Sequence, residues 1–291
     1  MKSLCILAGL ALGASASAAP LFYEPFLTGS DASAGEYSLA LLPGQGPTIA
    51  GATGTWGISN ADQSTSVNGR VTGTGLSYAG LPSAGGAAES FRNGSATFTG
   101  TFYFKRPAAQ PQTLDVSETL YFSGLVSFAS GKKVGIGVQF ENRDGFGVGF
   151  DSDGKAGIFV GDSFSGKTAG TYLPDTTYFI VGKMTPTGGA GNTGAGELIE
   201  LLAINPVDLA TEPAGNVTSS SQNVWGENVG TDDITNFLFI ATKSTSNVAA
   251  TADEIRVGKS WADVTATVPE PATMGLLGLA GLVGLRRRRA Q

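Results

Sequence analysis

The stretch from Val134 to Val160, VGIGVQFENRDGFGVGFDSDGKAGIFV, establishes the class of fold. It contains three apolar runs, and in the first two large side chains alternate with glycine or another small or polar residue. This period of two is typical of β-strands. The dipeptides Asp144-Gly145 and Asp153-Gly154 separate the runs and are strong signals for tight turns. The stretch therefore predicts an antiparallel meander with strands over 134–140, 146–150 and 156–160.

Further runs of the same kind lie on both sides of this meander. We expect strands at Ala96–Phe104, Leu120–Phe128, Thr177–Met184, Leu198–Asn205, Asn236–Thr242 and Asp253–Val257. No segment before residue 272 keeps a helical period over three turns, although Ser260–Val264 can form a short helical turn. The body is therefore predicted to be all-β, a single antiparallel sandwich of two sheets.

The N-terminus has the three parts of a secretory signal peptide. Met1-Lys2-Ser3 is a short cationic segment, Leu4–Ala14 is apolar, and the small residues Ala16 and Ala18 form an A-x-A cleavage site. We expect export through the Sec translocon and cleavage by signal peptidase after Ala18, so that residues 1–18 are removed. The single cysteine, Cys5, leaves with them.

The C-terminus reads as a short membrane segment. Pro269 and Pro271 prevent a helix from running through them, and the uncharged run Ala272–Leu285 follows. At ~1.5 Å per residue this run gives a helix of about 21 Å, shorter than the ~30 Å hydrocarbon core of a bilayer. A cationic cluster follows at Arg286, Arg287, Arg288 and Arg289. Arginines in this position stay on the cytoplasmic side, so the body is expected outside, in an inner-membrane intermediate.

The order Val268-Pro269-Glu270-Pro271, apolar helix and arginine cluster resembles the PEP-CTERM sorting signal of Gram-negative bacteria, here over 268–291. Pro269, Glu270 and Pro271 match its tripeptide. The resemblance implies that a membrane protease-transpeptidase, exosortase, removes the helix and the arginines. It also implies a bacterium that makes exopolysaccharide, with the mature protein at the cell surface or in the extracellular matrix.

The body carries a second resemblance, to the LamG-like jelly rolls of the concanavalin A type. Its motifs run through the whole body in the expected order: Leu21–Phe26, Gly54–Gly57, Gly75–Leu81, Tyr178–Met184, Ala203–Pro206, Asp253–Gly258 and Trp261–Val264. The resemblance implies a two-sheet jelly roll over 19–267 whose concave face can hold carbohydrate. Because the same fold serves lectins, glycosidases and inert modules, it does not assign an activity.

Composition excludes several classes of function. The chain has no histidine, which removes Ser-His-Asp catalysis and histidine-ligated zinc. Without Lys2 and the four terminal arginines, the net charge falls from −6 to about −11. Such an acidic protein is not expected to bind nucleic acid, which requires basic patches. With no cysteine in the mature chain, no disulfide framework is expected.

Two catalytic patterns also fail. Retaining glycosidases of this fold type carry E-x-D-x-x-E or a near variant on one strand, and no such string is present; Glu197 and Glu200 would lie on opposite faces of a strand. Gly161–Thr168 satisfies G-x-x-x-x-G-K-[ST], but the following Ala169–Pro174 cannot form the helix that a phosphate-binding loop needs. The protein is therefore predicted not to be an enzyme.

Four residues are candidates for ligand contacts. Asp151 and Asp153 resemble the start of a calcium-binding loop, although Lys155 breaks the EF-hand pattern. The alternative is that they form an ordinary turn, and no other cofactor is indicated. Trp56 and Trp225 can stack on sugar rings, or they can anchor the core and loops.

The leading hypothesis is thus a non-catalytic, exosortase-sorted surface or matrix protein that binds exopolysaccharide through its sandwich. A protein–protein adhesin is the first alternative. A glycoside hydrolase or lyase that uses carboxylates is the second.

Overall fold

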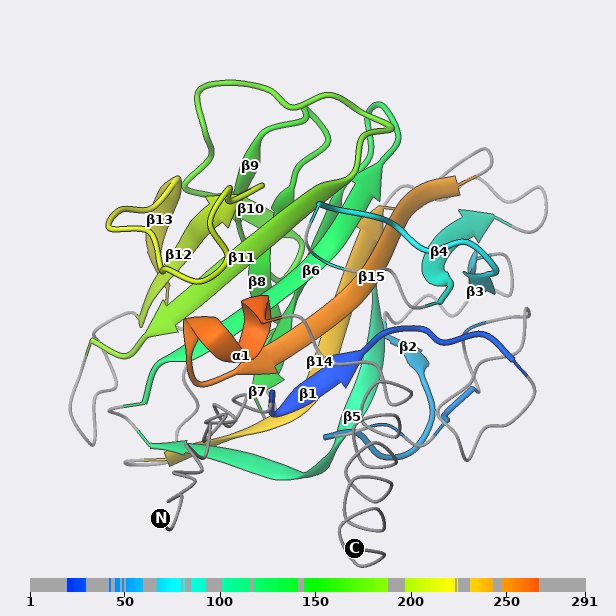
Figure 1. Ribbon diagram of the computed structural model, residues 1–291, viewed down its shortest axis with the longest axis horizontal. Coiled ribbons are helices and arrows are strands. Elements are labelled where there is room, and N and C mark those ends of the chain that lie inside the picture. Colours follow the sequence, from blue (N-terminus) through cyan, green and yellow to red (C-terminus); the bar gives the residue numbers. More distant parts are fainter. Residues whose placement is uncertain are drawn as a thin grey trace, which may run out of the picture.

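The computed structural model places the body as two antiparallel β-sheets packed face to face (Figure 1). It describes residues 20–29, 42, 45–47, 49, 51–59, 67–79, 81, 85–92, 101–115, 118–140, 144–187, 197–222, 224, 231–242 and 248–266. The predicted signal peptide, the sorting tail and Trp225 lie outside these residues. Among the described residues, no helix is long and apolar enough to span a membrane.

The first layer is an eight-stranded sheet. Its order is β13 (Thr218–Gln222), β12 (Glu197–Ile204), β11 (Tyr178–Thr185), β6 (Leu120–Phe128), β15 (Val248–Gly258), β4 (Ala87–Arg92) and β3 (Val67–Thr72). The eighth strand, β1 (Phe22–Glu24), pairs with β15.

The second layer is a seven-stranded sheet. Its order is β10 (Ser163–Ser165), β9 (Ala156–Val160), β8 (Phe146–Phe150), β7 (Val134–Phe140), β14 (Thr231–Thr242), β5 (Thr101–Asp115) and β2 (Gly57–Ser59). The chain crosses between the sheets repeatedly, after β1, β2, β4, β5, β6, β10, β13 and β14. The fold is therefore an all-β jelly roll, as predicted.

The core fills the space between the two sheets. Along β7, Ile136 and Val138 belong to this core, and the alternate glycines face the other way. Phe22 of the eight-stranded sheet stacks on Phe237 of the seven-stranded sheet with ring centroids 3.8 Å apart. The period-two pattern of the sequence is thus the alternation between core and outer face.

A second, smaller core covers the outer face of the eight-stranded sheet. The short helix α1 (Trp261–Thr265) lies over β6 and β15 (Figure 1). Its Trp261 and Val264 are buried with Leu125 and Phe179, which point outward from their strands. Ser260 caps the helix and Asp263 completes the capping box, so the helical turn predicted at 260–264 is confirmed.

The strands predicted over 120–128, 134–140, 146–150 and 156–160 are confirmed at their bounds as β6 to β9. β5 is different, because it begins at Thr101 and continues to Asp115 through Pro107 and Pro111. β2 pairs with β5 at residues 103–105 and an isolated bridge joins Ala52 to Ala108, so beyond Ala109 the described residues give β5 only β14 as a neighbour in the sheet. Proline is tolerated on such an edge.

Candidate functional site

A polar pocket lies on the outer face of the seven-stranded sheet. Its volume is about 310 Å³, at the lower end of the range for small-molecule sites. The lining residues are Tyr103, Lys105, Gln139, Asp144, Gly145, Gly161 and Asp162. Phe104 and Val138 point into the core, and because strand side chains alternate, their neighbours Tyr103, Lys105 and Gln139 point outward.

Two turns bring the acidic side chains of the pocket together. Asp144 and Gly145 precede β8, and Gly161 and Asp162 connect β9 with β10. The Gly161 amide donates a 2.9 Å hydrogen bond to the Gly145 carbonyl, which joins the turns. Gly161 has a φ of +55°, and a Cβ there would lie 3.3 Å from Asp144 Oδ2. Glycine at this position therefore permits the turn and leaves room beside the carboxylate.

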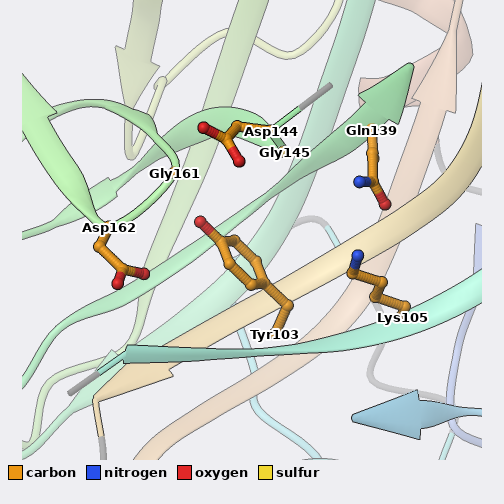
Figure 2. Close-up of a pocket in the computed structure, with 7 residues that line it drawn as sticks. All are labelled: Tyr103, Lys105, Gln139, Asp144, Gly145, Gly161 and Asp162. Carbon is orange, nitrogen blue, oxygen red and sulfur yellow. The ribbon is translucent and has the colours of Figure 1, made fainter. Parts of the chain in front are cut away.

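Tyr103 occupies the middle of the pocket. Figure 2 shows its ring between the two aspartates on one side and Lys105 and Gln139 on the other. Its hydroxyl oxygen is buried and has no hydrogen-bond partner among the residues that the structure describes. Burial raises the pKa of Tyr103, and the charges of Asp162 and Asp144 raise it further. The phenol therefore stays protonated and offers an unused hydrogen-bond donor.

The opposite end of the pocket carries a cation and an amide. Burial lowers the pKa of Lys105, and the charge of Asp144 opposes this effect. The ammonium lies 6.0 Å from the centroid of the Tyr103 ring. Gln139 Oε1 accepts a 3.0 Å hydrogen bond from Asn236 Nδ2, which fixes the amide. The pocket is thus polarised, with carboxylates at one end and nitrogen donors at the other.

The calcium candidates do not form a metal cage. Asp151 is buried, its Oδ1 accepts hydrogen bonds from the backbone amides of Asp153 and Lys155, and its Oδ2 lies 2.6 Å from Lys167 Nζ. Asp153 is exposed. No group of three potential metal-ligating side chains occurs among the residues that the structure describes. These contacts favour the ordinary-turn interpretation.

Trp56 is not among the residues that line the pocket. Trp56 is 1% exposed and stacks on Phe26 with ring centroids 5.8 Å apart, so its ring is part of the core and cannot stack on a sugar. The expectation of a ligand role for Trp56 is therefore corrected. Trp225 lies outside the described residues.

The match to a phosphate-binding loop is a β-hairpin. Gly161–Thr168 contains the β9–β10 turn and β10, no helix follows before residue 187, and Lys167 is paired with Asp151. The rejection of nucleotide binding is consistent with this geometry. Gly161 and Asp162 nevertheless contribute to the pocket, a role that the motif did not suggest.

Sequence reasoning missed the pocket because its residues come from four separate segments. Asp144 and Gly145 were identified only as a turn, Tyr103 only as part of a strand, and Lys105 lay just beyond the predicted end of that strand. The available signal was the alternation around Phe104. This alternation places the Tyr103 hydroxyl and the Lys105 ammonium together on the face of the sheet opposite the core.

Comparisons with known proteins identify the C-terminal end and give distant likenesses for the body. No curated protein matches the chain. The metal-free carbohydrate recognition domain of Emp46p is 7% identical, with a TM-score of 0.38, over 80% of this chain and 99% of that domain. That of Emp47p is 6% identical, with a TM-score of 0.37, over 68% and 90%.

Trypanosoma rangeli sialidase in complex with sialic acid is 13% identical, with a TM-score of 0.35, over 70% of this chain. The chain spans about a third of the length of that sialidase, 33%. Residues 267–289 match the family model described as the PEP-CTERM protein-sorting motif. The chain therefore ends in a PEP-CTERM sorting motif.

Proposed function

We propose that this protein is an exported, non-catalytic surface or matrix protein of a Gram-negative bacterium that binds polysaccharide through the pocket on its seven-stranded sheet. The observation that carries export and sorting is the PEP-CTERM motif over 267–289. In this proposal the Sec translocon and signal peptidase remove residues 1–18. The tail over 268–291 then holds the body, 19–267, at the inner membrane until exosortase cleaves it.

The pocket supports the binding part of the proposal. Asp144 and Asp162 can each accept hydrogen bonds from neighbouring sugar hydroxyls, and Lys105 can donate to a sugar oxygen. Such converging polar groups around an aromatic ring are the usual means of orienting a ligand in a small site. Exopolysaccharide is the ligand that the sorting motif and this chemistry favour together.

The sorting part is tested by the mass and location of the protein in cells with and without a functional exosortase. We expect a shorter, surface or extracellular product in the first strain and an uncleaved membrane-bound form in the second. Glu270→Ala should reproduce the second result in the first strain, because it alters the tripeptide. A product of full mass in the cytosol of both strains would contradict export and sorting.

One observation favours a second function, glycoside hydrolysis. Asp144 and Asp162 are two carboxylates in a single pocket, the residue types that glycosidases use as acid and as base or nucleophile. The test is prolonged incubation of the protein with soluble polysaccharide, followed by measurement of new reducing ends. If the original protein produces new reducing ends and the variants Asp144→Asn and Asp162→Asn do not, the result would favour hydrolysis over simple binding.

A further inference from the structure

We propose that the pocket selects a sugar with a free amino group, a 2-amino-2-deoxy sugar within a polysaccharide, over neutral or acidic sugars. The inference rests on the proposed function, because it assigns the ligand class of the same pocket. Its basis is the separation of charge across the pocket, with Tyr103 in the middle.

The carboxylates at the acidic end of the pocket can still accept hydrogen bonds and form ion pairs. Within the part of the chain that the structure describes, the carboxylates of Asp144 and Asp162 make no ion pair and accept no hydrogen bond. The hydrogen bond between Gly161 and Gly145 holds both on the same side of Tyr103 (Figure 2). A ligand ammonium placed there can form charge-assisted hydrogen bonds with these two carboxylates, which have no ion-pair partner among the described residues.

The centre of the pocket and the end with Lys105 carry hydrogen-bond donors, so a ligand must place acceptor oxygens there. Within the described residues, the Tyr103 hydroxyl is a buried donor without a partner. Beyond it, Lys105 presents an ammonium, which also donates. An amino sugar carries both features on one ring: an ammonium at carbon 2, and hydroxyl, ring and glycosidic oxygens around the rest. An amino sugar is also small enough for this pocket, which has the volume of a site for one small molecule.

Other sugar classes fit the charges less well. A uronic or sialic acid would bring a carboxylate into a pocket whose described lining has two carboxylates and one ammonium, and like charges at short range repel. A neutral sugar, including an N-acetylated one, can offer hydroxyls to the aspartates but no cation. The net charge of about −11 expected for the processed chain would also attract a polycationic polysaccharide over a longer distance.

The experiment measures binding of four tetrasaccharides to the full-length protein in mild detergent by isothermal titration calorimetry. The probes are the glucosamine tetramer, the N-acetylglucosamine tetramer, a neutral glucose tetramer and a galacturonic acid tetramer, compared at a slightly acidic pH. We expect the glucosamine tetramer to bind at least about tenfold more tightly than each of the others. Higher salt should weaken this preference, since it screens charge.

Three variants locate the effect. Asp144→Asn and Asp162→Asn should each reduce affinity for the glucosamine tetramer by about tenfold, with less effect on the neutral tetramer. Asp153→Asn is the matched control, because Asp153 is an exposed aspartate in the turn at the opposite ends of β8 and β9. It should bind like the original protein. Near-ultraviolet circular dichroism of each variant establishes that the fold is kept.

The outcomes separate the two proposals. Equal affinity for the free-amine and N-acetylated tetramers, or a preference that survives in both Asp144→Asn and Asp162→Asn, overturns the amino-sugar inference and leaves polysaccharide binding in place. A loss in Asp153→Asn equal to that in the pocket variants also overturns it, because the effect would then be general electrostatics. Binding of none of the four probes counts against polysaccharide binding itself.

Discussion

Lys167 Nζ lies 2.6 Å from Asp151 Oδ2, and this pair joins two sequence patterns that each suggested a ligand site. Asp151 opens the stretch that resembles a calcium loop, and Lys167 occupies the lysine position of the apparent phosphate-binding loop. The carboxylate is 2% exposed and the ammonium 38% exposed, so the pair lies at the boundary of the core. The two groups form an ion pair, and this contact favours a structural origin for both patterns.

This pair predicts a pH-dependent contribution to stability. Burial raises the pKa of Asp151, but hydrogen bonds from Lys167 and from the amides of Lys155 and Asp153 outweigh it, and the net pKa is lowered. The contribution is therefore present above the unfolded value of about 3.9 and is lost as pH falls through the lower folded value. Denaturation of Asp151→Asn and the original protein should differ by about 1–3 kcal/mol near neutral pH and converge in acid. A difference that grows in acid would contradict this assignment.

A buried ion pair near the C-terminal end of the body predicts a larger loss. Arg256 Nη2 lies 2.9 Å from Glu254 Oε2, both side chains are at most 1% exposed, and the Tyr23 hydroxyl donates to the same oxygen at 2.8 Å. Glu254→Ala should cost about 3–5 kcal/mol, because it leaves the arginine buried without its partner. Urea denaturation measures the loss, and Glu118→Ala, which breaks an exposed pair with Lys259, is the control at about 0–1 kcal/mol.

The backbone at Glu254 refines this prediction. Its φ is +51°, in the left-handed region that costs a residue with a Cβ about 1–2 kcal/mol. Glu254→Gly removes the same carboxylate as Glu254→Ala but relieves this cost. It should therefore be the more stable variant by roughly 1 kcal/mol. Equal stabilities in urea would mean that the local conformation changes when the ion pair is lost.

In the central meander, replacing a glycine with a larger residue is predicted to cause a clash with the neighbouring strand. A Cβ on Gly147 would lie 2.0 Å from the Ile136 carbonyl oxygen on the neighbouring strand β7. Gly147→Ala therefore forces these strands apart and should cost about 1–3 kcal/mol or more. Gly57→Ala in β2 is the control, because nothing lies within 4 Å of its Cβ position, and its effect should be within about 0.5 kcal/mol. Thermal unfolding of the two variants compares them.

The sequence predicted the parts of the fold whose signals are local. β7 and β8 alternate strongly, β6 and β9 are apolar runs, and turn residues lie between these strands, so their limits could be read directly. β10 and β13 escaped prediction because they are short, and their residues Ser163–Ser165 and Thr218–Gln222 are mostly polar. They are strands because they pair with β9 and β12, which is a long-range property. The predicted strand ended at Phe104, whereas β5 continues to Asp115. Its two prolines argue against a strand, because the sequence alone does not show that a segment lies at the edge of a sheet, where proline is tolerated.

The candidate site was less predictable for the same reason. Tyr103 and Asp162 are far apart in sequence, and only the order of the strands in the sheet brings them to one pocket. Trp56 shows the converse: its glycine-rich surroundings suggested a loop, and the fold buries it against Phe26. The sorting motif could be recognised without the structure, because it is defined by the order of residues along the chain.

Tyr103 gives the most direct prediction about the pocket, because stability and binding should change in opposite directions. Its buried hydroxyl has no hydrogen-bond partner in the described part of the chain, and a buried polar group without a partner destabilises a folded protein by about 1–3 kcal/mol. Tyr103→Phe removes the hydroxyl and keeps the ring. The melting temperature should stay equal or rise, and affinity for the glucosamine tetramer should fall by about threefold to tenfold.

The control for this change is Tyr121→Phe on the other sheet. The Tyr121 hydroxyl donates a 2.8 Å hydrogen bond to Glu212 Oε2, so its loss removes a satisfied interaction. That variant should lose about 0.5–1.5 kcal/mol of stability and keep its affinity for the tetramer. A Tyr103→Phe protein that is less stable than the original would mean that the hydroxyl has a partner in solution, such as an ordered water, and that a sugar would have to displace it.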